Sequence, residues 1–282
     1  MTPQFQMLET NGIKLRAHVE GEGPLIVLVH GFPESWYSWR HQIKPLAQAG
    51  FQVAAIDVRG YGGSDKPHDV SAYSMEEITA DVAGVAKALG HQQSILIGHD
   101  WGAPIVWNTS VLYPDVIRAV AGLSVPYAGL GPAPFIDIAR HFYTENGKFF
   151  YQEYFQAEGE AEAEFEADVR AFVRKIYYLW SGDFPPEMWP DHKKHGEQML
   201  VDMPEPPKSA LKWMTPDDWN YYVSEFEASG LRGPLNRYRT QHADYKYMAR
   251  QESDVIQQPC FFIGGERDGA MKMIPGKDLL DV

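Results

Sequence analysis

The chain has 282 residues, of which 44% are hydrophobic, and a formal net charge of −13. This length can bury a sizeable core in one large domain or two, and the acidity argues against a protein that binds nucleic acid or anionic membranes. The N-terminus carries no signal-peptide pattern, and no apolar run approaches the roughly 20 residues of a membrane span. We therefore expect a protein of the cytoplasm.

Residues 1–124 alternate strands with helices. Ser74 and Glu77 form a capping-box pattern before an apolar helical repeat, and Gly90 stands where that helix should end. An unbroken apolar run over 25–29 is typical of a strand covered on both faces. Strands are predicted over residues 13–19, 25–29, 53–56, 95–97 and 117–123, with helices over 35–49, 74–90 and after 101. This order predicts a parallel α/β sheet with helices on both faces.

The alternation stops after residue 124. Residues 125–258 contain no clear buried strand, and a connection of this length cannot be a simple loop, so we expect an inserted helical unit. An acidic run over 158–166 is expected to be a solvated helix face rather than a metal site. Helices are predicted over residues 165–180, 217–228 and 236–250.

A further strand is predicted over residues 259–264, where an apolar run resumes. Its Cys260 is the only cysteine of the chain, and we expect a small buried hydrophobe there. A single cysteine cannot form an internal disulfide, which suits a reducing compartment. The chain thus divides into a core over 1–124, a helical insertion over 125–258, and a second part of the core over 259–282.

Residues 95–103 carry the most informative pattern. An apolar run ends in Gly98-His99-Asp100-Trp101-Gly102, and an apolar helical pattern follows. The two glycines permit a tight turn and a close approach of helix and strand, as in a nucleophile elbow with Asp100 where serine hydrolases carry serine. The alternative is an ordinary strand-to-helix turn with a capping Asp. The Gly-rich loop 60–67 lacks the two common phosphate-binding patterns, G-x-G-x-x-G and the P-loop Lys-Ser/Thr, and is interpreted as a tight loop.

Five motifs occur in order along the chain: His30–Trp36, Asp57–Gly62, Gly98–Gly102, Tyr151–Gln156 and Arg232–Arg239. Together they resemble the soluble epoxide hydrolases of the α/β-hydrolase fold, and the similarity covers nearly the whole chain. The resemblance implies an α/β-hydrolase core with a mainly parallel sheet, an inserted helical cap, and no cofactor or metal. The expected reactants are a small apolar epoxide and water.

An Asp at the elbow suits displacement at carbon. A serine attacking an alkyl carbon would leave an ether that water cannot readily cleave, whereas a carboxylate leaves an ester that water can hydrolyse. A carboxylate is also ionised at neutral pH, so the first step needs no general base. Asp100 therefore points to epoxide opening or dehalogenation and argues against an esterase or lipase.

An opening epoxide develops alkoxide charge, which a phenol is suited to protonate. The resemblance maps two such tyrosines to Tyr151 and Tyr238, although Tyr154 competes with Tyr151 for the first assignment. Any of the 15 tyrosines is by default a packed aromatic side chain. The resemblance would place Trp at position 237, so Arg237 is expected to reshape the pocket wall.

Two alternatives remain open. Departure of a halide needs N–H donors, and Trp101 could supply one, but Phe32 stands where haloalkane dehalogenases usually carry Asn. This makes a dehalogenase the weaker assignment. A relative without catalytic activity, which binds apolar ligands between cap and core, is an alternative of a different class.

Hydrolysis of the ester needs an oxyanion hole and a base. By the usual arrangement of this fold, the backbone N–H groups of Phe32 and Trp101 should face the tetrahedral intermediate. His30 and His99 are interpreted as structural residues of their turns. Asp268 follows the strand at 259–264 and is expected to orient the base, with a turn Asp in Arg-Asp-Gly as the alternative.

No histidine follows Asp268 in the printed sequence, although the fold orders its partners as nucleophile, acid and histidine. The resemblance implies a further helix, strand and loop that would carry this base. A truncated chain or fragment, a separate polypeptide, or a natural non-catalytic relative would each account for this, and the first is favoured because the other site residues remain. In this form we expect impaired ester hydrolysis and an exposed sheet edge that favours aggregation or a homodimer.

Overall fold

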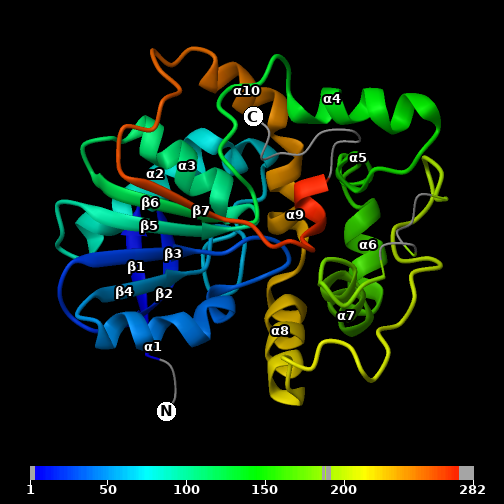
Figure 1. The fold of residues 1–282 in the computed structure, drawn as a ribbon, viewed down its shortest axis with the longest axis horizontal. Helices are drawn as coiled ribbons and strands as arrows, with labels where there is room; N and C mark the ends of the chain where they lie inside the picture. Colours follow the sequence, from blue (N-terminus) through cyan, green and yellow to red (C-terminus); the bar gives the residue numbers. More distant parts are fainter. Residues whose placement is uncertain (1–3, 186–187, 189–191, 273–282) are drawn as a thin grey trace.

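The computed structural model describes residues 4–185, 188 and 192–272 of the chain. Its strands are β1 (Phe5–Thr10), β2 (Ile13–Glu20), β3 (Leu25–Val29), β4 (Gln52–Ile56), β5 (Ser94–His99), β6 (Ile117–Leu123) and β7 (Cys260–Ile263). They form one sheet in the order β1-β2-β4-β3-β5-β6-β7 (Figure 1). β2 runs antiparallel to β1 and β4, and the other neighbouring pairs are parallel. The mainly parallel sheet predicted from the sequence is therefore confirmed.

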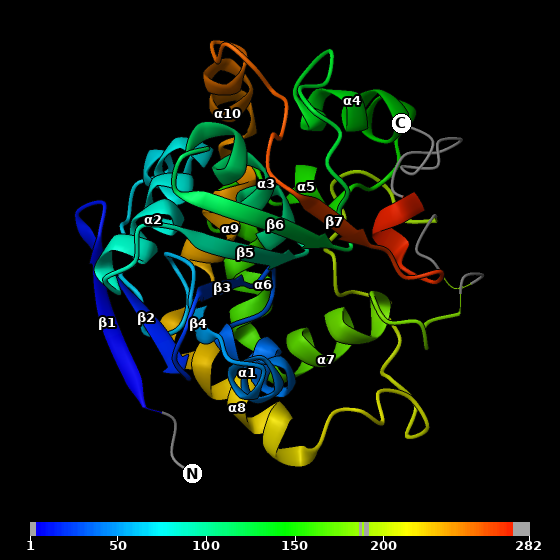
Figure 2. The same cartoon turned by 60° about the vertical axis from the view of Figure 1, so that its left-hand side comes forward.

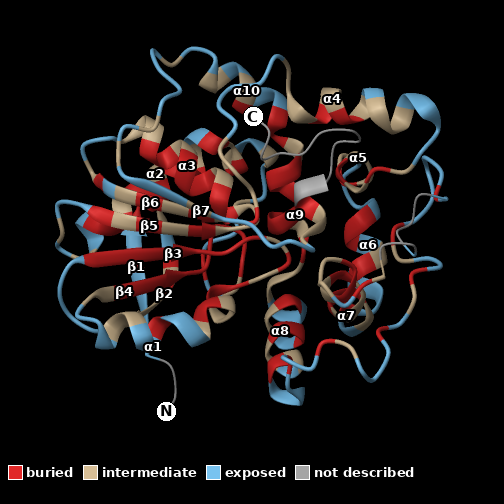
Figure 3. Cartoon of the chain, viewed as in Figure 1, coloured by how far each residue is buried: buried red, intermediate tan, exposed pale blue. Residues whose placement is uncertain are grey.

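Helices cover both faces of this sheet, as its unbroken apolar strands require. The first three are α1 (Arg40–Gln48), α2 (Met75–Ala88) and α3 (Gly102–Leu112). All five residues of β3 are buried: Leu25, Val27 and Val29 join the core that includes α2 and α3, whereas Ile26 and Leu28 join the core beside α1. Figure 3 shows the buried strands in the middle of the sheet. A strand buried on both faces has no polar side, which explains the apolar run.

The helix starts and ends predicted from the sequence are present in the structure, with small differences. The Ser74 side chain accepts a hydrogen bond from the Glu77 backbone N–H at 3.4 Å, and Gly90 follows the end of α2 with φ of +80°. The Glu77 carboxylate does not complete a capping box with Ser74 but accepts from the Asn11 amide at 2.9 Å. The helix predicted over 35–49 begins as a 3-10 turn, η1 (Trp36–Trp39), and continues as α1.

The segment between β6 and β7 is helical. Its elements are α4 (Phe135–Phe142), α5 (Tyr151–Tyr154), α6 (Glu160–Ala167), α7 (Val169–Leu179), α8 (Pro216–Ser229), α9 (Arg232–Arg239) and α10 (Gln241–Met248). α4 to α9 lie beyond one end of the sheet, and α10 packs beside α2 (Figures 1 and 2). Within the described part of this segment the only β pairing is an isolated bridge between Lys148 and Lys194. No helix of the described residues is long and apolar enough to cross a membrane.

The expectation that the acidic run over 158–166 is a solvated face holds only in part, because Glu158, Glu160 and Glu166 are exposed but the other two carboxylates are not. Glu162 is buried and pairs with Arg239 at 2.7 Å. Glu164 accepts hydrogen bonds from the backbone N–H groups of Met199 and Leu200, at 3.0 and 2.7 Å. These carboxylates bind donors brought in by distant segments, and the run therefore organises the helical segment instead of merely facing water.

The expectation that Cys260 is buried is wrong. β7 is the edge strand of the described sheet, and Cys260 is exposed on it. Phe261 and Ile263 on the same strand are 62% and 49% exposed. An apolar run predicts a strand, but whether its faces are covered depends on what packs against them.

Glycines allow α3 to lie directly against the sheet. A Cβ at Gly102 would sit 2.1 Å from the Val29 carbonyl oxygen, and one at Gly98 would sit 2.1 Å from the Gly102 carbonyl oxygen. Both contacts are with backbone atoms, which cannot rotate away as a side chain can. The two glycines therefore set how closely β3, β5 and α3 approach one another.

We predict that Gly102→Ala lowers the free energy of unfolding by about 3 kcal/mol, because a methyl group there overpacks rigid backbone. The matched control is Gly131→Ala, since a Cβ at Gly131 meets only the Ala133 carbonyl oxygen at 3.6 Å. The control should change stability by less than about 1 kcal/mol. Urea unfolding followed by circular dichroism measures both, and equal effects would contradict the close-approach explanation.

Candidate active site

Asp100 occupies a sharp turn between β5 and α3. Its φ is +51°, in the left-handed region that only glycine adopts without strain. The turn is closed by a hydrogen bond from Ala103 N–H to the Asp100 carbonyl at 3.0 Å, and the Asp100 N–H donates to the Leu123 carbonyl of the neighbouring strand β6 at 3.2 Å. The strand, turn and helix predicted from Gly98–Gly102 are present, and a strained residue held at such a place is typical of functional sites.

The Asp100 carboxylate points toward the loop that follows β3. The Phe32 backbone N–H donates to Oδ1 of Asp100 at 2.8 Å, and the Trp101 backbone N–H donates a second hydrogen bond to the carboxylate. A Cβ at Gly31 would sit 2.2 Å from the same Oδ1, so only glycine fits there. The two N–H groups predicted as an oxyanion hole therefore already hold the carboxylate.

A charged pair lies beside this carboxylate. Nδ1 of His99 is 2.7 Å from Oε1 of Glu34, and Oε2 of Glu34 accepts from the Gly31 backbone N–H at 3.2 Å. Both side chains line the same cavity as Asp100. Sequence reasoning treated His99 as a packed residue and assigned Glu34 no role, because nothing local indicates that the loop after β3 reaches the residue before Asp100.

Burial and this pair govern the ionisation of the site. Burial and the negative charge of Glu34 raise the pKa of Asp100 to about 6, against the lowering effect of His99 and the two backbone N–H groups. Burial would lower the pKa of His99, but the Glu34 carboxylate outweighs it and raises that pKa to about 9. The pKa of Glu34 is lowered, because the charge of His99 outweighs the effect of burial. His99 is therefore a cation at neutral pH and not a free base.

A cavity of about 590 Å³ lies between the elbow and the helical segment. It brings together four of the residues singled out from the sequence, Asp100, Tyr151, Tyr238 and Asp268, with Phe32 beside them. The rest of its lining combines apolar side chains with charged and polar ones; the apolar ones include Phe155, Ile176, Trp180, Met199 and Trp213, and the charged ones include Glu266 and Arg267. Among the described residues, no group of three or more His, Cys, Asp or Glu side chains is arranged to hold a metal ion.

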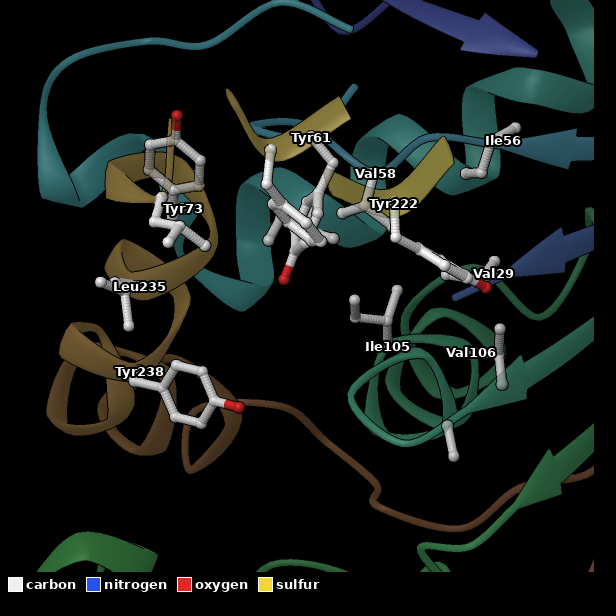
Figure 4. Close-up of a cluster of buried hydrophobic side chains, with 14 of the residues drawn as sticks. Val29, Ile56, Val58, Tyr61, Tyr73, Ile105, Val106, Tyr222, Leu235 and Tyr238 are labelled. Carbon is white, nitrogen blue, oxygen red and sulfur yellow. The ribbon is translucent and has the colours of Figure 1, made fainter. Parts of the chain in front are cut away.

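Tyr238 projects from α9 into the buried cluster. Its ring contacts Phe32 and Trp101 edge-on, with centroids 5.3 and 5.2 Å apart, and its side chain is hydrogen bonded to that of Trp101. Figure 4 shows Leu235 and Tyr238 on the same helix, in the cluster that also holds Tyr61 of the core. Burial raises the pKa of Tyr238 well above that of an ordinary phenol, so the hydroxyl stays protonated.

Tyr151, rather than Tyr154, reaches the cavity from α5. Nε2 of Gln152 donates to the Tyr151 hydroxyl at 2.8 Å, and the Tyr151 and Tyr238 rings lie 6.1 Å apart. Burial also raises the pKa of Tyr151. The Tyr154 hydroxyl instead donates to Glu164 at 2.8 Å, and Tyr154 is not part of the cavity wall. The geometry thus separates two tyrosines that the sequence motif could not.

Arg237 and Asp268 differ in whether they reach the cavity. Arg237 does not line the cavity, contrary to the expectation that it reshapes the pocket wall, but packs over the Trp101 ring at 4.6 Å. Asp268 follows β7 and lines the cavity, and its Oδ1 accepts from the Ala270 backbone N–H at 2.9 Å. Its charge contributes to the raised pKa of His99. Asp268 therefore both closes a turn and faces the site.

His30 supports the loop that carries Phe32. It is buried, its Nε2 accepts from the Val58 backbone N–H at 3.1 Å, and its Nδ1 lies 2.8 Å from the Gly31 carbonyl oxygen. Burial lowers the pKa of His30, so the ring is neutral. It joins the ends of β3 and β4 and does not line the cavity.

Comparison with known proteins agrees with this geometry. Residues 24–275 match the family model described as alpha/beta hydrolase fold. The chain is 36% identical to epoxide hydrolase B of Mycobacterium tuberculosis, over 95% of this chain and 85% of that protein. It is 38% identical to epoxide hydrolase 3 of Siraitia grosvenorii, over 93% of this chain and 80% of that protein.

Solved structures give the same result. An epoxide hydrolase from an endophytic Streptomyces superposes with a TM-score of 0.91 at 43% identity, covering 99% of this chain and 83% of that one. Epoxide hydrolase A from Mycobacterium thermoresistibile superposes with a TM-score of 0.87 at 38% identity, covering 94% of this chain and 83% of that one. The chain therefore belongs to the α/β-hydrolase fold family and, within it, to the epoxide hydrolases.

Proposed function

We propose that this protein opens epoxides toward vicinal diols through an ester formed on Asp100. One observation carries this proposal. A half-buried carboxylate on a strained elbow, held by two backbone N–H groups, shares one cavity with two protonated tyrosines and several apolar side chains. The substrates are small apolar epoxides and water, and no step uses a cofactor or metal.

In the first step the free oxygen of the Asp100 carboxylate attacks an epoxide carbon, and the carbon–oxygen bond of the ring breaks. The ring oxygen takes its proton from Tyr151 or Tyr238. Both phenols have raised pKa values, so they remain neutral donors while the carboxylate, with its pKa of about 6, is mostly ionised at pH 7. The pair of groups is thus in the correct protonation state without a base.

In the second step water attacks the carboxyl carbon of the ester. The N–H groups of Phe32 and Trp101, which hold Asp100 before the reaction, are placed to stabilise the oxyanion that then develops. We assign Asp268 the role of orienting the base for this water. Ester formation is the step that these residues perform directly, and a single turnover measures it as a covalent adduct.

We propose that the chain consists of two domains, both of which contribute residues to this chemistry. Residues 1–124 and 259–282 form the α/β-hydrolase core, and residues 125–258 form a cap that closes the cavity over Asp100. The support is that the elbow and the Phe32 loop come from the sheet, whereas Tyr151 and Tyr238 come from α5 and α9 of the helical segment.

We also propose a cytoplasmic location and a homodimer. The single cysteine and the acidic composition support the location. The exposed Phe261 and Ile263 on edge strand β7 support self-association, because apolar edges tend to pair. The mass of the protein in solution, measured by analytical ultracentrifugation, tests the dimer.

Asp100→Asn should abolish the covalent adduct formed with an aryl epoxide such as styrene oxide, because an amide oxygen is a poor nucleophile. Intact-mass spectrometry before and after exposure measures the adduct, and peptide mapping places it on Asp100. The substituted protein should still bind a non-reactive apolar ligand. If the substituted protein is still labelled, the assignment of Asp100 as the nucleophile is wrong.

Adduct formation should depend on pH through the ionisation of Asp100. The carboxylate is the reactive form and its pKa is raised to about 6. The rate constant should therefore be constant above about pH 7 and fall about tenfold per pH unit below about pH 6. Styrene oxide also hydrolyses in acid without protein, so its uncatalysed loss is measured at each pH. A midpoint near the ordinary value for Asp would contradict the burial effect.

Tyr151→Phe and Tyr238→Phe should each slow adduct formation by about tenfold or more, because each removes one proton donor for the ring oxygen. The double substitution should lose more than either single one. Tyr154→Phe is the matched control, since its hydroxyl bonds Glu164 outside the cavity. Rates are taken from the time course of the adduct mass. A Tyr154 effect as large as the others would reject the assignment.

A further inference from the structure

Arg237 is a buried cation next to Tyr238 on α9. Arg237 is 4% exposed, and its guanidinium carbon lies 4.6 Å from the centroid of the Trp101 ring. Nη1 lies 2.7 Å from Oδ2 of Asp244 on α10, and it also donates to the Thr240 hydroxyl. A planar guanidinium can lie flat on an indole while it forms hydrogen bonds in its own plane, which an ammonium cannot do.

The same ion pair fastens α9 and α10 to the core. Oδ1 of Asp244 accepts from the Met75 backbone N–H at the start of α2, at 2.6 Å. Nη1 of Arg237 donates to the Tyr73 carbonyl oxygen at 3.1 Å. Arg237 thus connects the helix that carries Tyr238 with the core segment 73–75 and with the residue that follows Asp100.

The Trp101 ring contacts both Arg237 and Tyr238. Arg237 covers its face, and the Tyr238 ring meets it edge-on at 5.2 Å with an interplanar angle of 86°. The side chains of Trp101 and Tyr238 are also hydrogen bonded, and the Trp101 backbone N–H bonds the Asp100 carboxylate. A shift of the indole would therefore displace the Tyr238 hydroxyl, whereas Asp100 is bonded through the Trp101 backbone and not through the indole.

Arg237 is not arranged for stability alone. Its Nε is buried and has no hydrogen-bond partner among the described residues, an arrangement that costs free energy. Its charge is balanced by Asp244, and it does not line the cavity, so it touches no substrate. What it contributes to the site is the placement of Trp101.

On the basis of the function proposed above, we propose that Arg237 is a positioning residue for ring opening: its guanidinium plane holds the Trp101 indole, which in turn places the Tyr238 hydroxyl against the epoxide oxygen. This role requires the plane and not only the positive charge. It acts on the rate of ester formation and not on substrate affinity, because Arg237 is outside the cavity wall.

The first test compares Arg237→Lys with Arg59→Lys. Arg59 is a matched control: it is 2% exposed and pairs with buried Asp81 at 2.5 Å, but contacts neither Trp101 nor the cavity. Both substitutions should lower stability. At saturating styrene oxide and per folded molecule, only Arg237→Lys should slow formation of the Asp100 adduct, by about tenfold, with the half-saturating concentration unchanged within about twofold.

Asp244→Asn provides a second variant if Arg237→Lys does not fold. It can keep an acceptor for the Met75 N–H while it removes the charge that holds Arg237. It should slow the adduct in the same direction. Wild-type rates in these variants, or rates lowered equally by Arg59→Lys, would overturn the positioning role.

A double-mutant cycle tests the route through Tyr238. In a Tyr238→Phe background, adding Arg237→Lys should slow adduct formation by less than about twofold, because the group it places is already gone. A further tenfold loss would overturn the route. If the wild-type protein forms no adduct on Asp100, the proposed function fails and this inference with it. If the wild type is labelled and Arg237→Lys is labelled equally fast, only this inference fails.

Discussion

The placement of one half-buried carboxylate on a strained turn is the constraint on which the rest of the structure depends. Asp100 sits at φ +51° with a pKa raised to about 6 by burial and by the nearby charge of Glu34. An uncompensated buried charge would be too costly to keep, so the site surrounds it with the N–H groups of Phe32 and Trp101 and with the His99 cation. Bringing those groups together requires close backbone approaches at Gly98 and Gly102. The elbow is therefore the product of the whole sheet rather than of its own five residues.

A second requirement is that proton donors from the helical segment be placed as accurately as the nucleophile from the sheet. α9 meets the core at two glycines: a Cβ at Gly233 would lie 2.6 Å from the Cα of Gly60. This contact and the Asp244 hydrogen bond to Met75 fix the helix that carries Tyr238. Tyr151 depends on the short helix α5 and on Gln152. The two phenols thus reach one cavity through separate supports, which explains why α5 and α9 both belong to the site although many residues separate them.

Ion pairs make several of the contacts between distant segments, and they explain why the prediction for the acidic run over 158–166 was incomplete. Arg16 of β2 pairs with Asp57 at 2.5 Å and with Glu225 of α8, so one side chain links the sheet to the helical segment. Glu162 and Arg239 do the same between α6 and α9. A run of acidic residues in a sequence is normally solvated, because partners from distant segments are not visible in it. Such partners are expected in a segment of short helices, because a short helix is only marginally stable by itself and depends on contacts with the rest of the protein.

The sequence by itself determined the mainly parallel sheet, most of its strands and the strand, turn and helix around Asp100, because these depend on alternation, capping and turn geometry within a few residues. The two tyrosines were indicated only by the family resemblance of their motifs. The sequence did not indicate β1, where only Leu8 and Thr10 are buried. Only the tertiary structure decided that Tyr151 and not Tyr154 reaches the cavity, that Glu34 and His99 pair beside Asp100, and that Cys260 lies exposed on an edge. It also showed that Arg237 packs on the Trp101 ring and does not line the cavity. Each of these outcomes depends on which distant segments meet, and burial, pKa and hydrogen bonding are properties of that meeting rather than of the local chain.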